Sequence, residues 1–265
     1  MKWSKGAEEL LAKVPFFVRG RVRKRVEEEA GRTGAREVSA NHVLTCRKRF
    51  LQNMESEVKG YAVETCFGPS GCPNQAMDAT GIVEKLDEIL SRRNLREFLK
   101  TRVQGPLKMH HEFRITVADC PNACSRPQIV DIGLIGAARP RFVPEECTGC
   151  GACLAACREA AMIPAQTGDS PARIDTERCL ACGQCIKACP SEALTTAASG
   201  FRILVGGKLG RHPQLGHELP GIFTPEETLR VVERCLDLYM EHSQAGERFG
   251  EILNRIGVDK IVEAL

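Results

Sequence analysis

The sequence predicts an α+β protein on the basis of three observations. Segments near both ends of the chain repeat apolar residues at the three- and four-residue spacing of amphipathic helices. The middle of the chain holds short apolar runs that are bounded by turn residues, which is typical of strands. A cysteine-rich segment over residues 147–189 interrupts these elements. We therefore expect a layer of sheet and helix with an inserted metal-binding domain and an N-terminal helical module.

The N-terminal module is expected over residues 1–58. Apolar residues follow helical spacing from Val14 to Val26, and Gly31 and Gly34 are expected to end that helix. Ser39 is a candidate N-cap for a second helix. This module is therefore predicted to be helical throughout.

The remaining elements are read from pattern and capping signals. Strands are predicted over Phe113–Ala118 and Ile129–Ile135, and a helical stretch begins near Ile82. Near the C-terminus, Thr224 has the sequence context of an N-cap, with Pro and Glu residues in the first turn after it. The buried stripe expected for this helix comprises Leu229, Val232, Leu236 and Tyr239.

Composition narrows the possible functions. The chain has 265 residues, of which 43% are apolar, and its net charge of +3 is too small to indicate nucleic-acid binding. It contains no apolar run long enough to span a membrane and opens on no signal-peptide pattern. Its 14 cysteines without an export signal favour metal ligation over disulfides. We therefore expect a cytoplasmic protein.

Eight of the cysteines form two copies of one pattern, C-x2-C-x2-C-x3-C, 32 residues apart. This is the pattern of bacterial ferredoxins with two 4Fe–4S clusters, in which the fourth cysteine of each run ligates the other cluster. The first predicted ligand set is Cys147, Cys150, Cys153 and Cys189, and the second is Cys157, Cys179, Cys182 and Cys185.

The residues around these runs help to distinguish iron–sulfur clusters from a zinc site or a disulfide scaffold. Gly149, Gly151 and Gly183 allow the backbone to come close to a cluster and present N–H donors to its sulfurs. Arg158 stands where ferredoxins usually have proline, which weakens the local match without removing a ligand. Zinc is the main alternative, but a zinc site does not need the third cysteine or the x3 spacing. A disulfide scaffold is the other alternative.

Four further cysteines form two pairs, C-x5-C and C-x3-C. The first pair is Cys66 and Cys72, and the second is Cys120 and Cys124. Each pair is placed where a strand is expected to give way to a loop, so the four thiols could meet at one end of the sheet. They could instead be buried apolar thiols. Cys46 and Cys235 belong to no motif and are expected to be core or surface residues.

The motif CPNAC at residues 120–124 marks a resemblance to a known family. Together with RPQIVDIGLIG at 126–136 and FRILVGGKLGRHPQL at 201–215, it resembles the siroheme and 4Fe–4S half of sulfite and nitrite reductases. The inserted ferredoxin pattern resembles dissimilatory sulfite reductase subunits in particular. The resemblance implies a siroheme domain in two parts, 59–138 and 199–265, around a ferredoxin domain at 139–198.

The resemblance implies a third 4Fe–4S cluster on Cys66, Cys72, Cys120 and Cys124, with Cys124 bridging to siroheme. Siroheme carries eight carboxylates, so cations and backbone donors are needed around it. The implied catalytic residues are Cys124, Lys108 and Arg114. The implied siroheme-binding residues are Asn122, Arg126, Gly207, Lys208, Gly210, Arg211 and His212. Taken alone, each cation could be a surface charge and the GGKLG segment an ordinary glycine turn.

The N-terminal stretch is similar to a second family. Residues 3–44 resemble the small helical domain that ends one subunit of the light-independent protochlorophyllide reductase, with Trp3, Arg19, Glu27 and Gly34 among the matching residues. The arginines and lysines at 19–25 could form a solvated face, or lie over an anionic tetrapyrrole or a partner protein.

The function implied by the first resemblance is reduction of sulfite or nitrite, with electrons passing from a donor protein through the ferredoxin clusters to siroheme. Full-length members of that family have two related halves, and this chain has only the second. The site could be completed by a second copy, as a homo-oligomer, or by another subunit, or the chain could reduce no sulfite. The alternative function is an iron–sulfur electron carrier that serves a partner enzyme or a tetrapyrrole-like substrate.

Overall fold

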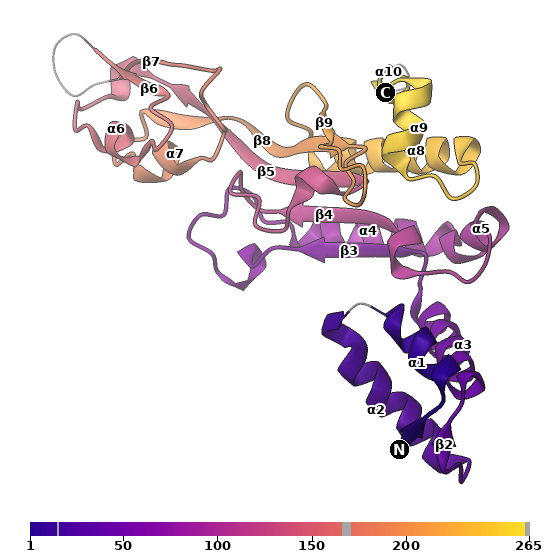
Figure 1. The fold of residues 1–265 in the computed structure, drawn as a ribbon. Helices are drawn as coiled ribbons and strands as arrows, with labels where there is room; N and C mark the ends of the chain where they lie inside the picture. Colours follow the sequence, from indigo (N-terminus) through magenta and orange to yellow (C-terminus); the bar gives the residue numbers. More distant parts are fainter. Residues whose placement is uncertain (15, 166–170, 263–265) are drawn as a thin grey trace. The chain divides into compact units, whose positions relative to one another are not determined.

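The computed structural model describes residues 1–14, 16–165 and 171–262. It divides into two compact units, of which the first comprises Met1–Lys59 with Gly105–His110 and the second comprises Gly60–Gln104 with His111–Leu265. No helix in the described part of the chain is long and apolar enough to cross a membrane. Figure 1 shows the elements of both units.

The first unit is mainly helical. Its elements are β1 (Lys2–Trp3), α1 (Lys5–Ala12), α2 (Phe16–Arg32), β2 (Glu37–Val38) and α3 (Ala40–Glu57). β1 and β2 pair in parallel, and the indole N–H of Trp3 donates a hydrogen bond of 2.8 Å to Glu27. The small core consists of Ala7, Val26, Ala30, Val38 and Val43.

Most of the expected helix boundaries are confirmed in this unit. Ser39 is the N-cap of α3, and its backbone N–H donates to Nδ1 of His42. The prediction for Gly31 was wrong, because α2 continues to Arg32. The chain leaves the helix at Gly34, whose φ of 71° lies in the left-handed region that glycine tolerates. The side chains at positions 15–18 lie outside the described residues.

The second unit is built on one five-stranded sheet of order β3-β4-β5-β8-β9. β3, β4 and β5 are parallel, whereas β5–β8 and β8–β9 pair antiparallel. The strand bounds are β3 (Tyr61–Thr65), β4 (Phe113–Ala118), β5 (Ile132–Phe142), β8 (Leu194–Val205) and β9 (His217–Glu218). The three parallel strands bring their carboxyl ends to one edge of the sheet.

Helices α4 (Thr80–Arg92), α5 (Leu95–Arg102), α8 (Pro225–His242), α9 (Phe249–Ile256) and α10 (Asp259–Val262) pack with this sheet. Their apolar residues and those of the central strands form one continuous core, in which Leu86 and Leu236 are fully buried. The predicted cap of α8 is confirmed, since Thr224 Oγ1 accepts a hydrogen bond of 3.3 Å from the Glu227 N–H.

The long pair β5–β8 differs from what the sequence predicts. The strand begins at Ile132 instead of Ile129, because Arg126 has a left-handed φ of 60° and starts a 3-10 helix at Pro127–Ile129. At its other end the pairing continues through residues 139–142 and 194–198, with a bulge at Arg139/Pro140. Residues 139–142 and 194–198, at the two ends of the expected ferredoxin insert, therefore belong to paired strands and not to linkers.

The cysteine-rich lobe lies at the far end of β5 and β8 (Figure 1). It contains α6 (Ala152–Ala156), β6 (Met162–Pro164), β7 (Pro171–Ile174) and α7 (Gln184–Ala188). Among its described residues the core is small, with Cys153, Met162, Cys185 and Leu194 as the buried members. Two of these are predicted cluster ligands.

Candidate iron–sulfur site

The first group of four thiols surrounds a pocket in the lobe. Cys147, Cys150, Cys153 and Cys189 all line it, together with Phe142 and Leu194 from the two long strands. Gly149 and Gly151 have φ values of 70° and 71°, which permit the tight turn between the first cysteines. Although burial raises the pKa of the Cys189 thiol, backbone N–H groups of Ser191, Leu194 and Ala193 outweigh it and lower the pKa overall.

The second group contains Cys157, Cys179, Cys182 and Cys185. Burial raises the pKa of the Cys185 thiol most, and the three other thiols of the group also raise it. Together they bring the pKa to about 12. Cys157 Sγ accepts a hydrogen bond of 3.3 Å from the N–H of Ala161. The fourth cysteine of the first run therefore lies with the first three of the second run.

The third group forms where β3 and β4 end. These strands are parallel, with Thr65 opposite Val117, so the residues that follow them emerge at one edge. Burial raises the pKa of the Cys120 thiol, and the thiols of Cys72, Cys124 and Cys66 add to the increase. The structure thus brings together four cysteines from two distant segments.

The chemistry of these groups fits iron–sulfur clusters. Buried thiols that also repel one another as thiolates stay protonated unless a cation is bound among them. Cys66 Sγ accepts hydrogen bonds of 3.3 Å from the N–H groups of both Gly68 and Asp119, and such donors stabilise thiolate ligands. In the described residues no three His, Cys, Asp or Glu side chains are arranged to hold a single metal ion.

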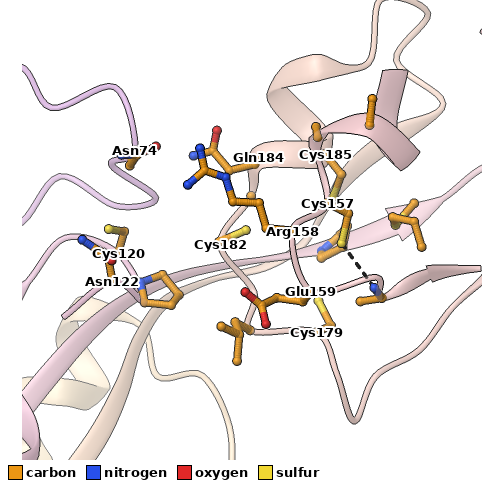
Figure 2. A pocket seen from close by; sticks show the side chains of 18 residues that line it. Asn74, Cys120, Asn122, Cys157, Arg158, Glu159, Cys179, Cys182, Gln184 and Cys185 are labelled. Carbon is orange, nitrogen blue, oxygen red and sulfur yellow. Dashed lines mark hydrogen bonds between the residues drawn. The ribbon is translucent and has the colours of Figure 1, made fainter. Parts of the chain in front are cut away.

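A cleft of about 520 Å³ joins the second and third groups. Figure 2 shows Cys120 and Asn122 on one side, and Cys157, Cys182 and Cys185 on the other. Arg158 and Gln184 also line this cleft. The described part of the chain offers no hydrogen-bond partner for the buried Nε2 of Gln184.

Asp119 is an important residue that the sequence patterns did not identify. It is 1% exposed and directly precedes Cys120. Its backbone oxygen accepts hydrogen bonds from the N–H groups of Ala76 and Met77, at 2.8 and 3.1 Å. Its Oδ2 accepts one of 2.7 Å from Nε2 of Gln75. The sequence signal that could have identified Asp119 is a carboxylate at the end of a buried strand, because such a group needs hydrogen-bonding partners.

The predicted siroheme residues next to Cys124 are exposed. Asn122 Nδ2 donates a hydrogen bond of 3.0 Å to the Cys124 sulfur, and both residues are exposed. Arg126 is also exposed and forms no ion pair within the described residues. Because Cys124 is the exposed thiol of the third group, this is the side on which a large cofactor has access.

The glycine-rich loop packs beside the segment that follows Arg126. Gly216 N–H donates a hydrogen bond of 2.8 Å to the carbonyl of Gln128. A Cβ at Gly207 would lie 2.5 Å from that same carbonyl, so this glycine is required for close packing. Gly210 has a φ of 119°, and the loop exposes Arg211 and His212.

Lys208 has a partner within the protein. It is 9% exposed, and its ammonium donates a hydrogen bond of 2.6 Å to Oε1 of Glu251. The other oxygen of Glu251 accepts from the Arg248 N–H, and the Arg248 guanidinium in turn pairs with the buried Asp131. The network holds the loop against α9, with Lys208 paired to Glu251. Sequence patterns did not identify the other three members of the network, Glu251, Arg248 and Asp131.

The two predicted catalytic cations, Lys108 and Arg114, belong to different units of the molecule. Arg114 is near the start of β4, at the opposite end of that strand from Cys120. Six residues of strand separate them by about 20 Å. Lys108 belongs to the Gly105–His110 segment of the first unit. Within the second unit, the structure therefore does not bring Arg114 to the cysteine groups.

Known proteins resemble this chain over most of its length. Residues 59–265 match the model of the nitrite and sulphite reductase 4Fe-4S domain, and residues 3–47 match that of the proto-chlorophyllide reductase 57 kD subunit. A coenzyme F420-dependent sulfite reductase of Methanocaldococcus jannaschii is 31% identical over 224 residues, which cover 83% of this chain and 33% of that protein.

Two further relatives extend the comparison. One subunit of the anaerobic sulfite reductase of Salmonella typhimurium is 25% identical, over 54% of this chain and 42% of that protein. The crystal structure of dissimilatory sulfite reductase I has a TM-score of 0.52 at 21% identity, covering 82% of this chain and 56% of that one, and so shares the fold. The chain spans less than half the length of both curated relatives. By its match over residues 59–265, the chain belongs to the nitrite and sulphite reductase 4Fe-4S domain family.

Proposed function

We propose that this chain is the iron–sulfur and siroheme-binding half of a sulfite (or nitrite) reductase. The observation that carries the proposal is the convergence of twelve cysteines into three groups of four within one unit, with Cys124 exposed at the end of the series. Each group would hold one 4Fe–4S cluster. The relatives named as sulfite reductases support sulfite as the substrate.

The proposed organisation follows from this function. Residues 1–58 are a helical module, 59–138 and 199–265 form the siroheme domain, and 139–198 form an inserted two-cluster ferredoxin domain. The pairing of β5 with β8 extends into the insert and supports a rigid attachment of the insert to the sheet. Such an attachment would keep the cluster sites of the lobe at a fixed distance from the sheet edge.

The thiol groups lie in an order suited to electron relay. The second group lines the same cleft as Cys120 of the third group, whereas the first group lines a separate pocket. Electrons from a donor protein would therefore enter at the first group and pass through the second to the third. This order makes the exposed Cys124 side the place where the substrate is reduced.

The residues around Cys124 support a role in holding siroheme. Exposed Arg126 and Arg211 carry charges that can pair with carboxylates, and Asn122 holds the Cys124 sulfur through its amide. Lys208 would act indirectly, by keeping the loop in place through Glu251. When bound, siroheme would supply an iron with an open position at which a small anion can take up electrons.

The remainder of the substrate pocket would come from another chain. The chain spans about a third of the Methanocaldococcus jannaschii relative. The predicted catalytic cation Arg114 lies at the opposite end of β4 from Cys120. We therefore propose that a second copy or a different subunit provides the cations that bind the substrate.

Anaerobic purification followed by a visible spectrum and an activity assay tests the proposal. Siroheme absorbs in the red, whereas clusters give broad brown absorption. We expect a red band, and viologen-coupled turnover of sulfite or nitrite once the partner chain is present. Clusters without a red band would instead indicate the electron-carrier function.

Substitution of the bridging residue tests the role of Cys124. A Cys124→Ser protein should lose the coupling between cluster and siroheme in its spectrum, together with most of its activity. Cys46→Ser, which changes a half-buried cysteine of the first unit, is the matched control. Full activity and unchanged coupling in Cys124→Ser would refute the bridging role.

A further inference from the structure

We infer that Gln75 is a positioning residue that fixes the third cysteine group relative to the second. It is hydrogen-bonded in two directions, through its side chain to Asp119 and through its carbonyl to Lys187. The inference rests on the proposed function, because the two groups need a fixed separation only if electrons pass between them.

On one side, Gln75 holds the loop that follows Cys72 against the segment that contains Cys120. Its amide Nε2 donates a hydrogen bond of 2.7 Å to Oδ2 of Asp119. The next two N–H groups, of Ala76 and Met77, donate to the Asp119 carbonyl. The N–H of Asp119 also donates a hydrogen bond to Cys66 Sγ. Asp119 is therefore hydrogen-bonded both to the loop and to a cysteine of the third group.

On the other side, Gln75 receives a contact from the cysteine-rich lobe. The ammonium of Lys187 on α7 donates to the Gln75 carbonyl, and its Nζ lies 3.5 Å from the Pro73 carbonyl. Lys187 stands between Cys185 of the second group and Cys189 of the first. A charged donor that reaches two carbonyls of one loop resists displacement of that loop better than a neutral one.

The lobe also has an attachment that does not involve Gln75. Ala138 N–H on β5 donates a hydrogen bond of 2.7 Å to the Ala181 carbonyl, and Gly183 packs close to Ala138. Substitutions at Gln75 or Lys187 should therefore leave the lobe folded and its four-cysteine groups intact. What they should change is the position and mobility of the loop at 73–77.

The test compares Gln75→Ala and Lys187→Ala with Lys187→Arg and Lys85→Ala. Lys187→Arg keeps a charged donor, and Lys85 is an exposed lysine of α4 without a hydrogen bond in the described part of the chain. Hydrogen exchange at the Ala76 and Met77 amides measures the loop, and the magnetic interaction between reduced clusters in EPR spectra measures their relative placement. All proteins are purified anaerobically and matched for iron content.

We expect exchange about tenfold faster in Gln75→Ala and Lys187→Ala, as for loss of a charge-assisted hydrogen bond. The magnetic interaction should weaken in the same two proteins and be retained in Lys187→Arg and Lys85→Ala. Unchanged exchange and unchanged interaction in both alanine variants would overturn the positioning role. A wild-type protein with about eight irons would instead refute the proposed third cluster, and the exchange measurement would still report on the contact.

Discussion

The cysteine-rich lobe and the edge of the sheet build the same kind of thiol group in different ways. In the lobe, each group comes from two short runs with glycines at positive φ, and two of its cysteines are part of the core. At the sheet edge, the thiols follow two parallel strands, and although Cys120 is buried, none of the four belongs to the apolar cluster that joins the sheet and its helices. Folding of the lobe should therefore depend on iron, whereas the sheet should fold and then bind it.

The largest expected effect is that of iron removal on the lobe. Chelation should unfold the lobe, because two of the four buried members of its small core, Cys153 and Cys185, are cluster ligands and the bound iron would supply much of its stability. The sheet and α8 should keep their hydrogen-exchange protection. Amide hydrogen exchange, followed along the whole chain before and after anaerobic chelation, measures both regions in one experiment. Equal loss of protection in the two regions would contradict the comparison.

A substitution in the sheet core should have the reverse effect. Leu86 is fully buried on α4, so Leu86→Ala should lower the free energy of unfolding of the sheet by about 2–5 kcal/mol. The lobe should retain its iron at denaturant concentrations that unfold the sheet. Val262→Ala, at an exposed position on α10, should change stability by less than about 0.5 kcal/mol. If the sheet and the lobe of Leu86→Ala unfolded at the same denaturant concentration, the two regions would fold as one cooperative unit.

A glycine beside the third group provides a smaller and more local test. A Cβ at Gly68 would lie 2.2 Å from Oδ2 of Asp119, so Gly68→Ala should cost about 1–3 kcal/mol and reduce iron binding at this group. Gly81 on α4 has no atom within 4 Å of the added Cβ, so Gly81→Ala is the control. Iron content and denaturant midpoints measure both proteins. Equal iron in the two variants would argue against a tight fit at Asp119.

The smallest expected effect concerns the loop that carries Lys208. Burial raises the pKa of Glu251, but hydrogen bonds from Lys208 and Arg248 outweigh it and hold the pKa below its usual value. The stabilisation is therefore present above the unfolded pKa of about 4.3 and is lost as pH falls through the folded value. Glu251 is 42% exposed at its side chain, so Glu251→Gln should cost only about 0.5–1 kcal/mol at pH 7.

Hydrogen exchange of α9 amides at pH 7 and pH 4 measures this contribution. The difference between wild type and Glu251→Gln should shrink at the lower pH. Glu233→Gln, on the exposed face of α8, should show no such difference at either pH. A cost that grows on acidification would contradict the assigned ion pair.

The sequence allowed the lobe to be predicted in more detail than the sheet edge. The spacing within each run matches the ferredoxin pattern, in which the fourth cysteine of each run joins the other group, so the grouping of Cys157 and Cys189 could be predicted from that pattern. The start of β5 could not be predicted in the same way, because Ile129 belongs to a 3-10 helix and the strand begins only at Ile132. Gln75, Asp119 and Glu251 were missed because their partners are distant in sequence and no short motif marks them.

The most direct test of the account is the iron and sulfide content of anaerobically purified wild type and of a Cys66→Ser/Cys72→Ser variant. Three clusters correspond to about 12 irons in the wild type. The variant should hold about eight irons and keep a folded lobe. About eight irons in both proteins would contradict the third group as a cluster site.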